Sequence, residues 1–442
     1  MALRDAVIDR RSVTIGLCLG FVLVSGGRAL ADNGEDLLAL YRDLHAHPEL
    51  SLHEVRTSAR IADELERSGF AVTRAVGGHG VVAVLENGAG PTLLIRSDLD
   101  ALPVKERTGL AYASTQTATD DGGREVSLMH ACGHDVHMTV LVGTARELAR
   151  QRAAWRGTLI LIGQPAEERG LGAKAMLDDG LFDRFPRPDF NLALHVSAEL
   201  AAGTVAVMGG AVAANVDSVD IAVHGVGGHG AYPHMTRDPV MLAASIVMNL
   251  QTLISRERPP LDPAVITVGS IHGGTKSNII SDRVDLELTV RSFSDATRRL
   301  LLDGIARLAQ GQAHALGWPE EKLPVVTVRE ENTPAVWNDP ALAERLRGAF
   351  AAVLGPEQVL RVSPTMGGED FARYGRDDPR IPSVLFWLGA VDATRHAAAA
   401  ENGTALPSLH SAEFAPDATT TIATGVKAMQ AAALDLLAPG VP

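Results

Sequence analysis

Residues 129–137 read Met-His-Ala-Cys-Gly-His-Asp-Val-His, a stretch that brings three histidines, a cysteine and an aspartate together. A glycine-rich polar run precedes it at 120–123, and an apolar helical pattern follows it from 136 to 148. The stretch is therefore predicted to be a loop that enters the N-terminus of a helix. Cys132 and His134 can converge on one metal ion, since a thiolate and an imidazole suit zinc and its neighbours. The alternative is a polar loop with one buried cysteine.

Three apolar segments around this loop are predicted to be buried strands: 91–97, 157–163 and 191–194. At their carboxyl ends they deliver Asp98 and Asp100, then Glu167 and Glu168, then His195. Open α/β sheets hold their ligands at these ends, so the repetition indicates a site rather than a random surface. Helical patterns separate the strands at 136–152 and 171–182. The β-α-β order predicts an α/β fold whose largely parallel sheet is covered on both faces.

The pattern of predicted strands and helices changes after about residue 213. The predicted order is strand, helix, strand, strand, helix, strand, with strands at 217–224, 264–271, 283–291 and 324–330. Asp238-Pro239 marks the start of the first helix, and the second covers 295–317. This β-α-β-β-α-β order is ferredoxin-like and predicts a compact inserted domain.

After the insertion, the pattern is again typical of an α/β fold, with a strand at 381–388, a loop at 409–411 and a last helix at 416–438. The alanine run 397–400 is expected to lie in a loop. We therefore expect a catalytic domain in two parts, 32–213 and 331–442, interrupted by a lid and dimerisation domain at 214–330.

The bulk composition narrows the functional class. The 442-residue chain carries a formal net charge of −13 and shows no basic stripe, which argues against a nucleic-acid partner. It is 46% hydrophobic but only 4% aromatic, so an aliphatic core is expected.

Residues 1–31 resemble an export signal. Arg10-Arg11 precedes a modestly apolar run at 13–24, and Ala29-Leu30-Ala31 is typical of a cleavage site. The pattern favours a twin-arginine signal and a periplasmic or secreted product; without a working signal the protein would stay cytoplasmic. The apolar run is too short for a stable membrane span. Cleavage would remove Cys18 and leave Cys132 as a lone thiol, which metal ligation would occupy.

The chain resembles the dinuclear-metal amidohydrolase and exopeptidase family that includes aminoacylase and carboxypeptidase G. It is most similar to the branch of hippurate hydrolases and indole-acetyl-amino-acid hydrolases. The matching stretches occur in family order over about 37–440: LHAHPELSLHE, IRSDLDALPV, MHACGHDVHM, GQPAEE, ALHV, GVGGHGAYPH, GGTKSNIISD, MGGEDFARY and SLHS.

The resemblance implies two divalent metal ions per subunit, Zn²⁺ or Mn²⁺, with Co²⁺ also compatible. The implied ligands are Cys132, His134, Glu168, His195 and His410. Cys132 would bridge the two ions, and such a pair can activate water and polarise an amide carbonyl. Glu167 is the implied general base, which takes a proton from water and returns it to the departing amine.

The lid supplies the remaining implied residues: His229, Asn278 and Arg291. His229 would be catalytic, with a hypothesised hydrogen bond to the oxyanion, and the resemblance allows it to act in the partner subunit's site. Arg291 would hold a substrate carboxylate. Asp98 stands where sister branches place a metal-binding histidine, so Asp98 and Asp100 are assigned a supporting role.

The predicted function is hydrolysis of the amide bond of N-acyl amino acids or short peptides by a homodimer that joins through its lid. The alternatives are a dipeptidase or carboxypeptidase on the same scaffold, or an inactive lid-bearing binding protein. Arg169 and Ser197-Ala198 depart from the family pattern, which has glycine after the paired glutamates and a tryptophan-proline after the strand histidine. Both departures flank the predicted site and bear on substrate preference.

Overall fold

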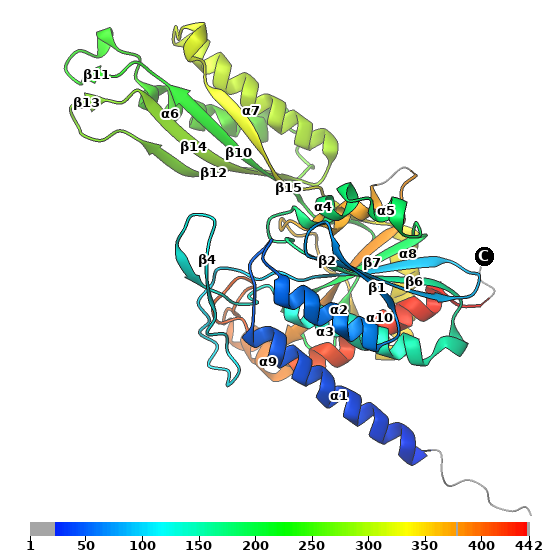
Figure 1. Ribbon diagram of the computed structural model, residues 1–442. Coiled ribbons are helices and arrows are strands. Elements are labelled where there is room, and N and C mark those ends of the chain that lie inside the picture. The colour runs from blue at the N-terminus through cyan, green and yellow to red at the C-terminus, as the bar shows by residue number, and fades with distance from the viewer. Residues whose placement is uncertain (1–22, 377–378, 440–442) are drawn as a thin grey trace, which may run out of the picture.

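An eight-stranded mixed sheet lies at the centre of the larger part of the molecule in the computed structural model, which describes residues 23–376 and 379–439 (Figure 1). In spatial order its strands are β1 (Ala71–Val76), β2 (Gly80–Asn87), β6 (Gly157–Gln164), β3 (Thr92–Asp98), β7 (Phe190–Ala201), β18 (Ser383–Val391), β8 (Val205–Ala206) and β17 (Val359–Leu360). The four central strands, β6, β3, β7 and β18, run parallel, whereas β1, β2 and β6 pair antiparallel. The prediction of a largely parallel sheet is confirmed.

Both faces of this sheet are buried, which explains why its central strands are almost continuously apolar. One face packs against α1 (Leu23–Ala46), α2 (Val55–Arg67), α3 (His134–Arg150), α8 (Pro340–Leu354) and α10 (Ala418–Leu436). The other face is covered by α4 (Gly172–Asp178), α5 (Leu181–Arg184), η6 (Asp370–Gly375) and a small ribbon of β9 (Gly210–Ala213) and β16 (Val336–Asn338). Alternate strand residues face opposite layers, as with Ile95 on one side and Leu94 on the other.

A second sheet forms an arm that projects from the catalytic body (Figure 1). Its order is β12 (Ala264–Gly273), β14 (Arg283–Ser292), β10 (Asn215–His224) and β15 (Val325–Thr333), all antiparallel. The helices α6 (Pro239–Thr252) and α7 (Asp295–Ala315) pack on one face. This connectivity is the ferredoxin-like arrangement that the element order predicts. The exact boundaries of the inserted domain stay predictions, and the one at 330/331 falls inside β15.

A short ribbon of β11 (Gly228–His229) and β13 (Ile279–Ile280) lies at the end of the arm away from the catalytic body (Figure 1). The hairpin of β4 (Thr117–Thr119) and β5 (Glu125–Ser127) projects from the body itself. Asp238 caps α6 as the Asp-Pro signature predicts, because its side chain accepts a hydrogen bond from the Val240 N–H group at 2.9 Å.

Three local predictions were inaccurate. The alanine run 397–400 lies in a helix, α9 (Ala393–Asn402), which Asp392 caps and which alanine favours intrinsically. The predicted helix at 171–182 is two helices, α4 and α5, because Gly180 adopts φ 77° between them. The strand that carries His195 continues to Ala201 rather than ending at the histidine.

The predicted export signal lies mostly outside the described residues, as does Cys18. The predicted cleavage position after Ala31 lies within α1. Among residues 23–376 and 379–439, no helix has both the length and the apolar character that crossing a bilayer requires.

Candidate metal centre

The loop that carries Cys132 is shaped by Gly133. This glycine adopts φ 79°, and a Cβ atom there would approach Val196 Cγ2 to 2.5 Å. Only glycine therefore allows both the left-handed turn and the close packing on β7. The turn sets Cys132 at the end of the loop and His134 at the first position of α3, as the sequence predicts.

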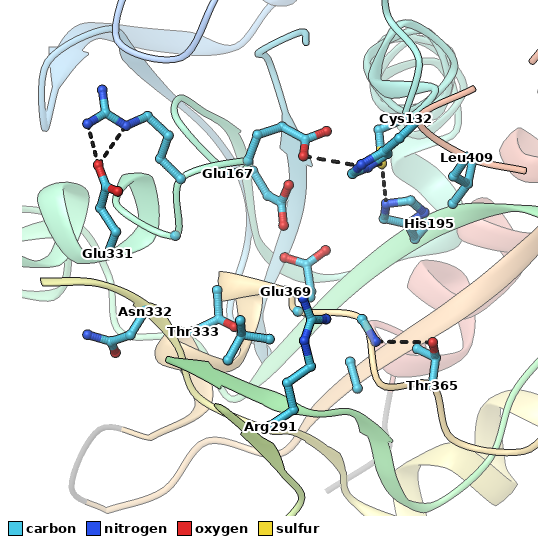
Figure 2. Close-up of a pocket in the computed structure, with 18 of the residues that line it drawn as sticks. Cys132, Glu167, His195, Arg291, Glu331, Asn332, Thr333, Thr365, Glu369 and Leu409 are labelled. Atoms are coloured by element: carbon cyan, nitrogen blue, oxygen red, sulfur yellow. Dashed lines mark hydrogen bonds and ion pairs between the residues drawn. The ribbon is translucent and has the colours of Figure 1, made fainter. Parts of the chain in front are cut away.

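Five predicted ligands converge from four separate segments of the chain. Cys132 Sγ lies 3.4 Å from His195 Nε2 and 3.2 Å from His410 Nε2. His134 Nε2 lies 3.8 Å from Glu168 Oε1, and Glu168 Oε2 lies 3.6 Å from His410 Nε2. The donor atoms thus form one continuous cluster, which Figure 2 shows around Cys132 and His195.

The donors fit a pair of divalent cations. His134 Nε2 and Glu168 Oε1 are buried and have no hydrogen-bond partner in the described part of the chain. A buried polar atom without a partner is costly, and a bound cation would satisfy both atoms at once. The sulfur, imidazole and carboxylate donors together suit zinc and manganese.

The electrostatics of the cluster also call for added positive charge. Burial, together with Glu168 and Glu167, raises the pKa of Cys132 well above its ordinary value. Burial would lower the pKa of His134, yet Asp98, Asp100 and Glu168 raise it to about 10. The cluster therefore holds more negative charge than its own residues neutralise, and divalent cations would reverse this balance.

The orientation of the histidines is fixed by groups behind them. His134 Nδ1 donates to the backbone oxygen of Asp100 at 2.8 Å, which leaves Nε2 facing the cluster. His195 Nδ1 donates to the Val196 oxygen at 2.8 Å, and so presents Nε2 in the same way. Asp98 Oδ1 contacts His137 Nδ1 at 2.7 Å, and His137 Nε2 accepts the Val196 N–H group at 2.9 Å.

Asp100 holds the backbone of Glu167 and Glu168 in place. Its carboxylate accepts the backbone N–H groups of Glu167 at 3.1 Å and Glu168 at 3.0 Å. Ala166 adopts φ 49°, a left-handed conformation that turns the chain just before the pair. Glu167 Oε2 lies 3.8 Å from His134 Nε2. Burial, then Glu369 and Glu168, raises the pKa of Glu167 well above its ordinary value. A carboxyl group with these surroundings is suited to accept a proton near neutral pH.

A cavity of about 550 Å³ opens beside the cluster, between the catalytic body and the base of the arm. Cys132, Glu167, Glu168, His195, His410 and Arg291 on β14 line it. Figure 2 shows Arg291 on the opposite side from Cys132 and Glu167. Arg291 Nη1 donates to the Met366 oxygen at 2.6 Å, and no carboxylate within the described residues pairs with its guanidinium. The cavity therefore offers a small ligand both the donor cluster and an uncompensated cation.

The structure does not bring every predicted residue to this cavity. His229 is exposed on β11, and Asn278 is exposed just before β13, at the far end of the arm. The two lie near one another, since the Gly230 N–H group donates to the Asn278 oxygen at 2.9 Å. Neither residue lines the cavity beside Glu167 within its own chain.

Sequence reasoning missed one buried residue of the site, Arg96, and left another open. Arg96 is fully buried in β3 and donates to Asp98 at 2.7 Å and to Asp370 at 3.0 Å. Glu369 also contacts Arg96 and lines the cavity; its glycine-rich motif had left two interpretations open, a residue that supports the site or a solvated turn. The usable signal was an arginine inside an otherwise apolar strand, because such a charge needs buried acidic partners.

Three comparisons place these observations among known proteins. The sequence matches the model for peptidase family M20/M25/M40 over residues 94–411. It is 35% identical to an N-acetyldiaminopimelate deacetylase of Leuconostoc citreum over 82% of this chain and 90% of that one. It is 32% identical to thermostable carboxypeptidase 1 of Saccharolobus solfataricus over 80% of this chain and 85% of that one.

The fold is similar to that of the Bacillus subtilis YXEP protein, described as a dinuclear metal-binding peptidase of the M20 family. The two share a TM-score of 0.73 and 29% identity over 92% of this chain and 99% of the other.

Proposed function

The chain belongs to peptidase family M20/M25/M40, and on that premise we propose that its substrates are N-acyl derivatives of α-amino acids. The protein is a metal-dependent hydrolase of amide bonds. The observation that carries the substrate class is the cavity, where Arg291 faces the glutamate pair without a carboxylate of its own. An α-carboxylate on Arg291 would bring the neighbouring amide toward Glu167. Resemblance to a deacetylase and to a carboxypeptidase leaves the acyl side, a simple acid or an amino acid, to experiment.

We assign the metal ligands as predicted: Cys132, His134, Glu168, His195 and His410. When bound, the two divalent ions would lower the pKa of water and polarise the amide carbonyl. Glu167 then accepts a proton from water and delivers it to the departing nitrogen. Asp98 and Asp100 hold the ligand histidines and the glutamate loop in place, and Arg291 binds the carboxylate of the substrate. Zn²⁺ and Mn²⁺ both suit this donor set, and Co²⁺ is a workable substitute.

The position of His229 supports a homodimer. If it is to donate a hydrogen bond to the oxyanion, it must reach a cavity other than that of its own chain, because it lies at the far end of the arm. We propose that two arms associate so that His229 and Asn278 enter the partner subunit's cavity. The arm offers exposed apolar side chains for such a contact, among them Met241 and Met248 on α6.

We also propose that residues 1–31 direct export and are removed. The basis is the Arg10-Arg11 pair followed by an apolar run and Ala29-Leu30-Ala31. Mass spectrometry of the protein recovered from the periplasm of an expressing bacterium should give a mature N-terminus at Asp32. Full-length protein in the cytoplasm would contradict this assignment.

The substrate proposal is tested with purified protein loaded separately with Zn²⁺, Mn²⁺ or Co²⁺. The panel contains N-acetyl and N-benzoyl amino acids, dipeptides, and matched amides in which the α-carboxylate is replaced by a carboxamide. We expect release of the amino acid from the N-acyl compounds and at least a tenfold lower kcat/KM, about 1.4 kcal/mol, when the carboxylate is missing. Equal rates for acids and carboxamides would contradict the role of Arg291 and the substrate class.

A further inference from the structure

Glu369 presents a second carboxylate to the cavity, opposite Glu167. It is 3% exposed, lines the cavity, and follows two glycines in the loop between β17 and η6. Carboxylate oxygens of Glu167, Glu369 and Asp370 lie within 4.8 Å of one another. In the view of Figure 2, the Glu369 side chain lies between those of Arg291 and Glu167.

The Glu369 side chain is held in a fixed orientation. Oε1 accepts the Phe371 N–H group at 2.9 Å and lies 2.9 Å from Arg96 Nη2. Oε2 accepts Arg96 Nη1 at 3.3 Å. The loop before it is packed tightly, since a Cβ atom on Gly368 would approach Thr333 Oγ1 to 2.8 Å and Val216 Cγ2 to 2.9 Å. The carboxylate is therefore oriented before any ligand arrives.

This arrangement leaves an acceptor site open toward the cavity. A carboxylate has about four lone-pair sites, and the described contacts use two on Oε1 and one, at a long distance, on Oε2. Oε2 can therefore accept one further hydrogen bond. Because no other described N–H or O–H group contacts this oxygen, it is available to a donor group on a ligand in the cavity.

The distance between the Glu167 and Glu369 carboxylates allows the nitrogen of the scissile amide to contact both. Glu167 must come within hydrogen-bond distance of that nitrogen to protonate it. Two hydrogen bonds of about 2.9 Å span about 5.8 Å, which exceeds the 4.8 Å limit between the two carboxylates. One nitrogen atom can therefore contact both glutamates. Arg291 and Glu369 line the same cavity, and Arg291 is anchored to the loop of Glu369 through the oxygen of Met366, three residues earlier.

We infer that Glu369 is a substrate-binding residue that accepts the N–H group of the scissile amide, and that it makes the enzyme selective for secondary amides. The inference rests on the proposed function. The nitrogen keeps its own hydrogen, gains one proton through Glu167 as the C–N bond breaks, and gains the other when the carboxylic acid product ionises. The product ammonium group is then held by Glu369 while Arg291 holds its carboxylate. An N-methylated amide lacks the N–H group and would leave the buried acceptor unpaired.

The test compares secondary and tertiary amides that differ by one methyl group. The metal-loaded enzyme is assayed with N-acetyl- and N-benzoylglycine, and with the corresponding derivatives of sarcosine, which is N-methylglycine. For the wild type we expect kcat/KM to favour the glycine compounds by at least about 100-fold, because a site built to accept an N–H group rejects analogues without it. In Glu369→Gln the preference should fall below about tenfold, since the amide NH₂ group can face the cavity instead.

Asp370→Asn is the matched control. Asp370 contacts the same Arg96 side chain at 3.0 Å but does not line the cavity. The Asp370→Asn variant should have a kcat that is lowered equally for both amides, and it should keep the wild-type preference for the glycine amide. A general loss of packing would act alike on both amides and both variants, so the ratio separates binding from structure.

The outcomes distinguish the inference from the function on which it rests. The inference is overturned, while the function stands, if Glu369→Gln keeps the full preference for glycine amides over sarcosine amides. The same conclusion follows if Asp370→Asn loses this preference to the same extent as Glu369→Gln. If Glu369→Gln does not fold, the wild-type enzyme alone gives the second measurement. Equal kcat/KM values for the glycine amides and the sarcosine amides would also overturn the inference. Absence of turnover of every secondary amide by the wild type overturns the proposed function and the inference together.

Discussion

At the residue scale, two features define the site. Buried metal-donor atoms have no hydrogen-bond partner, and the nearby cationic side chains are too few to neutralise the carboxylates. His134 Nε2 and Glu168 Oε1 lie 3.8 Å apart, buried and without hydrogen bonds in the described part of the chain. Asp98 and Asp100 position the neighbouring groups, and Glu167 stands beside the cluster without being needed to complete it. Because the ligands and the base are different residues, substituting one of each should affect metal content and catalysis differently.

Glu167→Gln should lower kcat by about 10²- to 10⁴-fold, the usual contribution of a general base. The change removes the proton acceptor but keeps the size of the side chain. Metal content, measured by inductively coupled plasma mass spectrometry, should stay at two ions per subunit. Retained activity would remove the assignment of Glu167 as the base.

Cys132→Ser should lower the metal content below two ions per subunit. A hydroxyl group is a far weaker ligand than a thiolate, and Sγ lies within 3.4 Å of both His195 and His410. In the Co²⁺-loaded protein, the sulfur-to-metal charge-transfer band in the near-ultraviolet spectrum should also disappear. A two-metal count in the variant, or the absence of such a band from the Co²⁺-loaded wild type, would show that the thiol is not a ligand.

The five candidate ligands lie in motifs that the family resemblance identifies in the sequence, whereas their supporting residues could not be predicted in this way. Arg96 pairs with Glu369, which lies 273 positions later in the chain. His137 belongs to the cysteine loop, but both of its ring nitrogens are used by Asp98 and Val196 rather than by a metal. Such partnerships are set by tertiary packing, and neither spacing nor periodicity encodes them. The roles of the five ligands and of Glu167 remain predictions until metal is located.

At the element scale, a buried ion cluster braces α1 against the start of α3. His45, at the end of α1, contacts Asp135 at 2.7 Å and Glu106 at 3.0 Å, and all three are buried. Burial opposes the charged imidazole, but the two carboxylates raise the pKa of His45 to about 9. The brace thus fixes the helix whose first residue is His134.

This raised pKa predicts a pH dependence of stability. A group with a raised folded-state pKa stabilises the fold fully below its unfolded value, near 6.5, and loses that contribution as pH rises through about 9. The gap of about 2.5 units corresponds to about 3 kcal/mol. Urea unfolding of metal-free wild type and His45→Gln should show a stability difference that is largest near pH 6 and shrinks by pH 10. A difference that stays constant over this range would contradict the charged state of His45.

A second contact between elements involves Arg169, which departs from the family pattern. Its Nη1 lies 2.8 Å from Asp121 in the β4–β5 hairpin, and its Nε lies 2.9 Å from Glu331 on β15. Arg169 therefore connects the loop after Glu168 to the base of the arm across one wall of the cavity.

Arg169→Gly should raise KM by about fivefold, or about 1 kcal/mol, with little change in kcat, because the wall of the cavity loses its anchor but the glutamates stay in place. The KM of the wild type should rise with NaCl, since the ion pairs are partly exposed, while the KM of the variant should not. Arg184→Ala, which removes an exposed ion pair with Asp179 on the body, is the control. An effect of equal size in the control would rule out a specific role for Arg169.

Secondary structure was largely predictable because apolar periodicity and capping residues act locally. The Asp-Pro start of α6 and the ferredoxin-like order of the arm needed no tertiary information. The helix over the alanine run 397–400 was missed because the run was expected to lie in a loop, although alanine has high helix propensity and Asp392 provides a cap. The break at Gly180 depends on a left-handed conformation that periodicity does not reveal.

At the scale of the whole molecule, the arm sets His229 and Asn278 apart from the cavity of their own chain. The length of the arm depends on how the chain folds, so the separation of these two residues from the cavity could not be predicted from the sequence. If His229 acts in the partner subunit's cavity, one active site combines residues from two chains.

Mixed dimers test this arrangement. Glu167→Gln and His229→Ala subunits, each inactive alone, are denatured, mixed in equal amounts and refolded. Half of the dimers are then mixed and each mixed dimer has one intact site, so about a quarter of wild-type activity should return for a twofold-symmetric dimer. If no activity returns although mixed dimers are detected by native mass spectrometry, His229 does not act across the interface.

The central claim is that Cys132, His134, Glu168, His195 and His410 surround a pair of divalent ions beside Glu167. Anomalous diffraction from crystals of the zinc-loaded protein, recorded on both sides of the zinc absorption edge, tests it most directly. We predict two peaks about 3.5–4 Å apart, with Cys132 Sγ between them and Glu167 bound to neither. A single peak held by Asp98, His134 and His137, or peaks remote from Cys132, would contradict it.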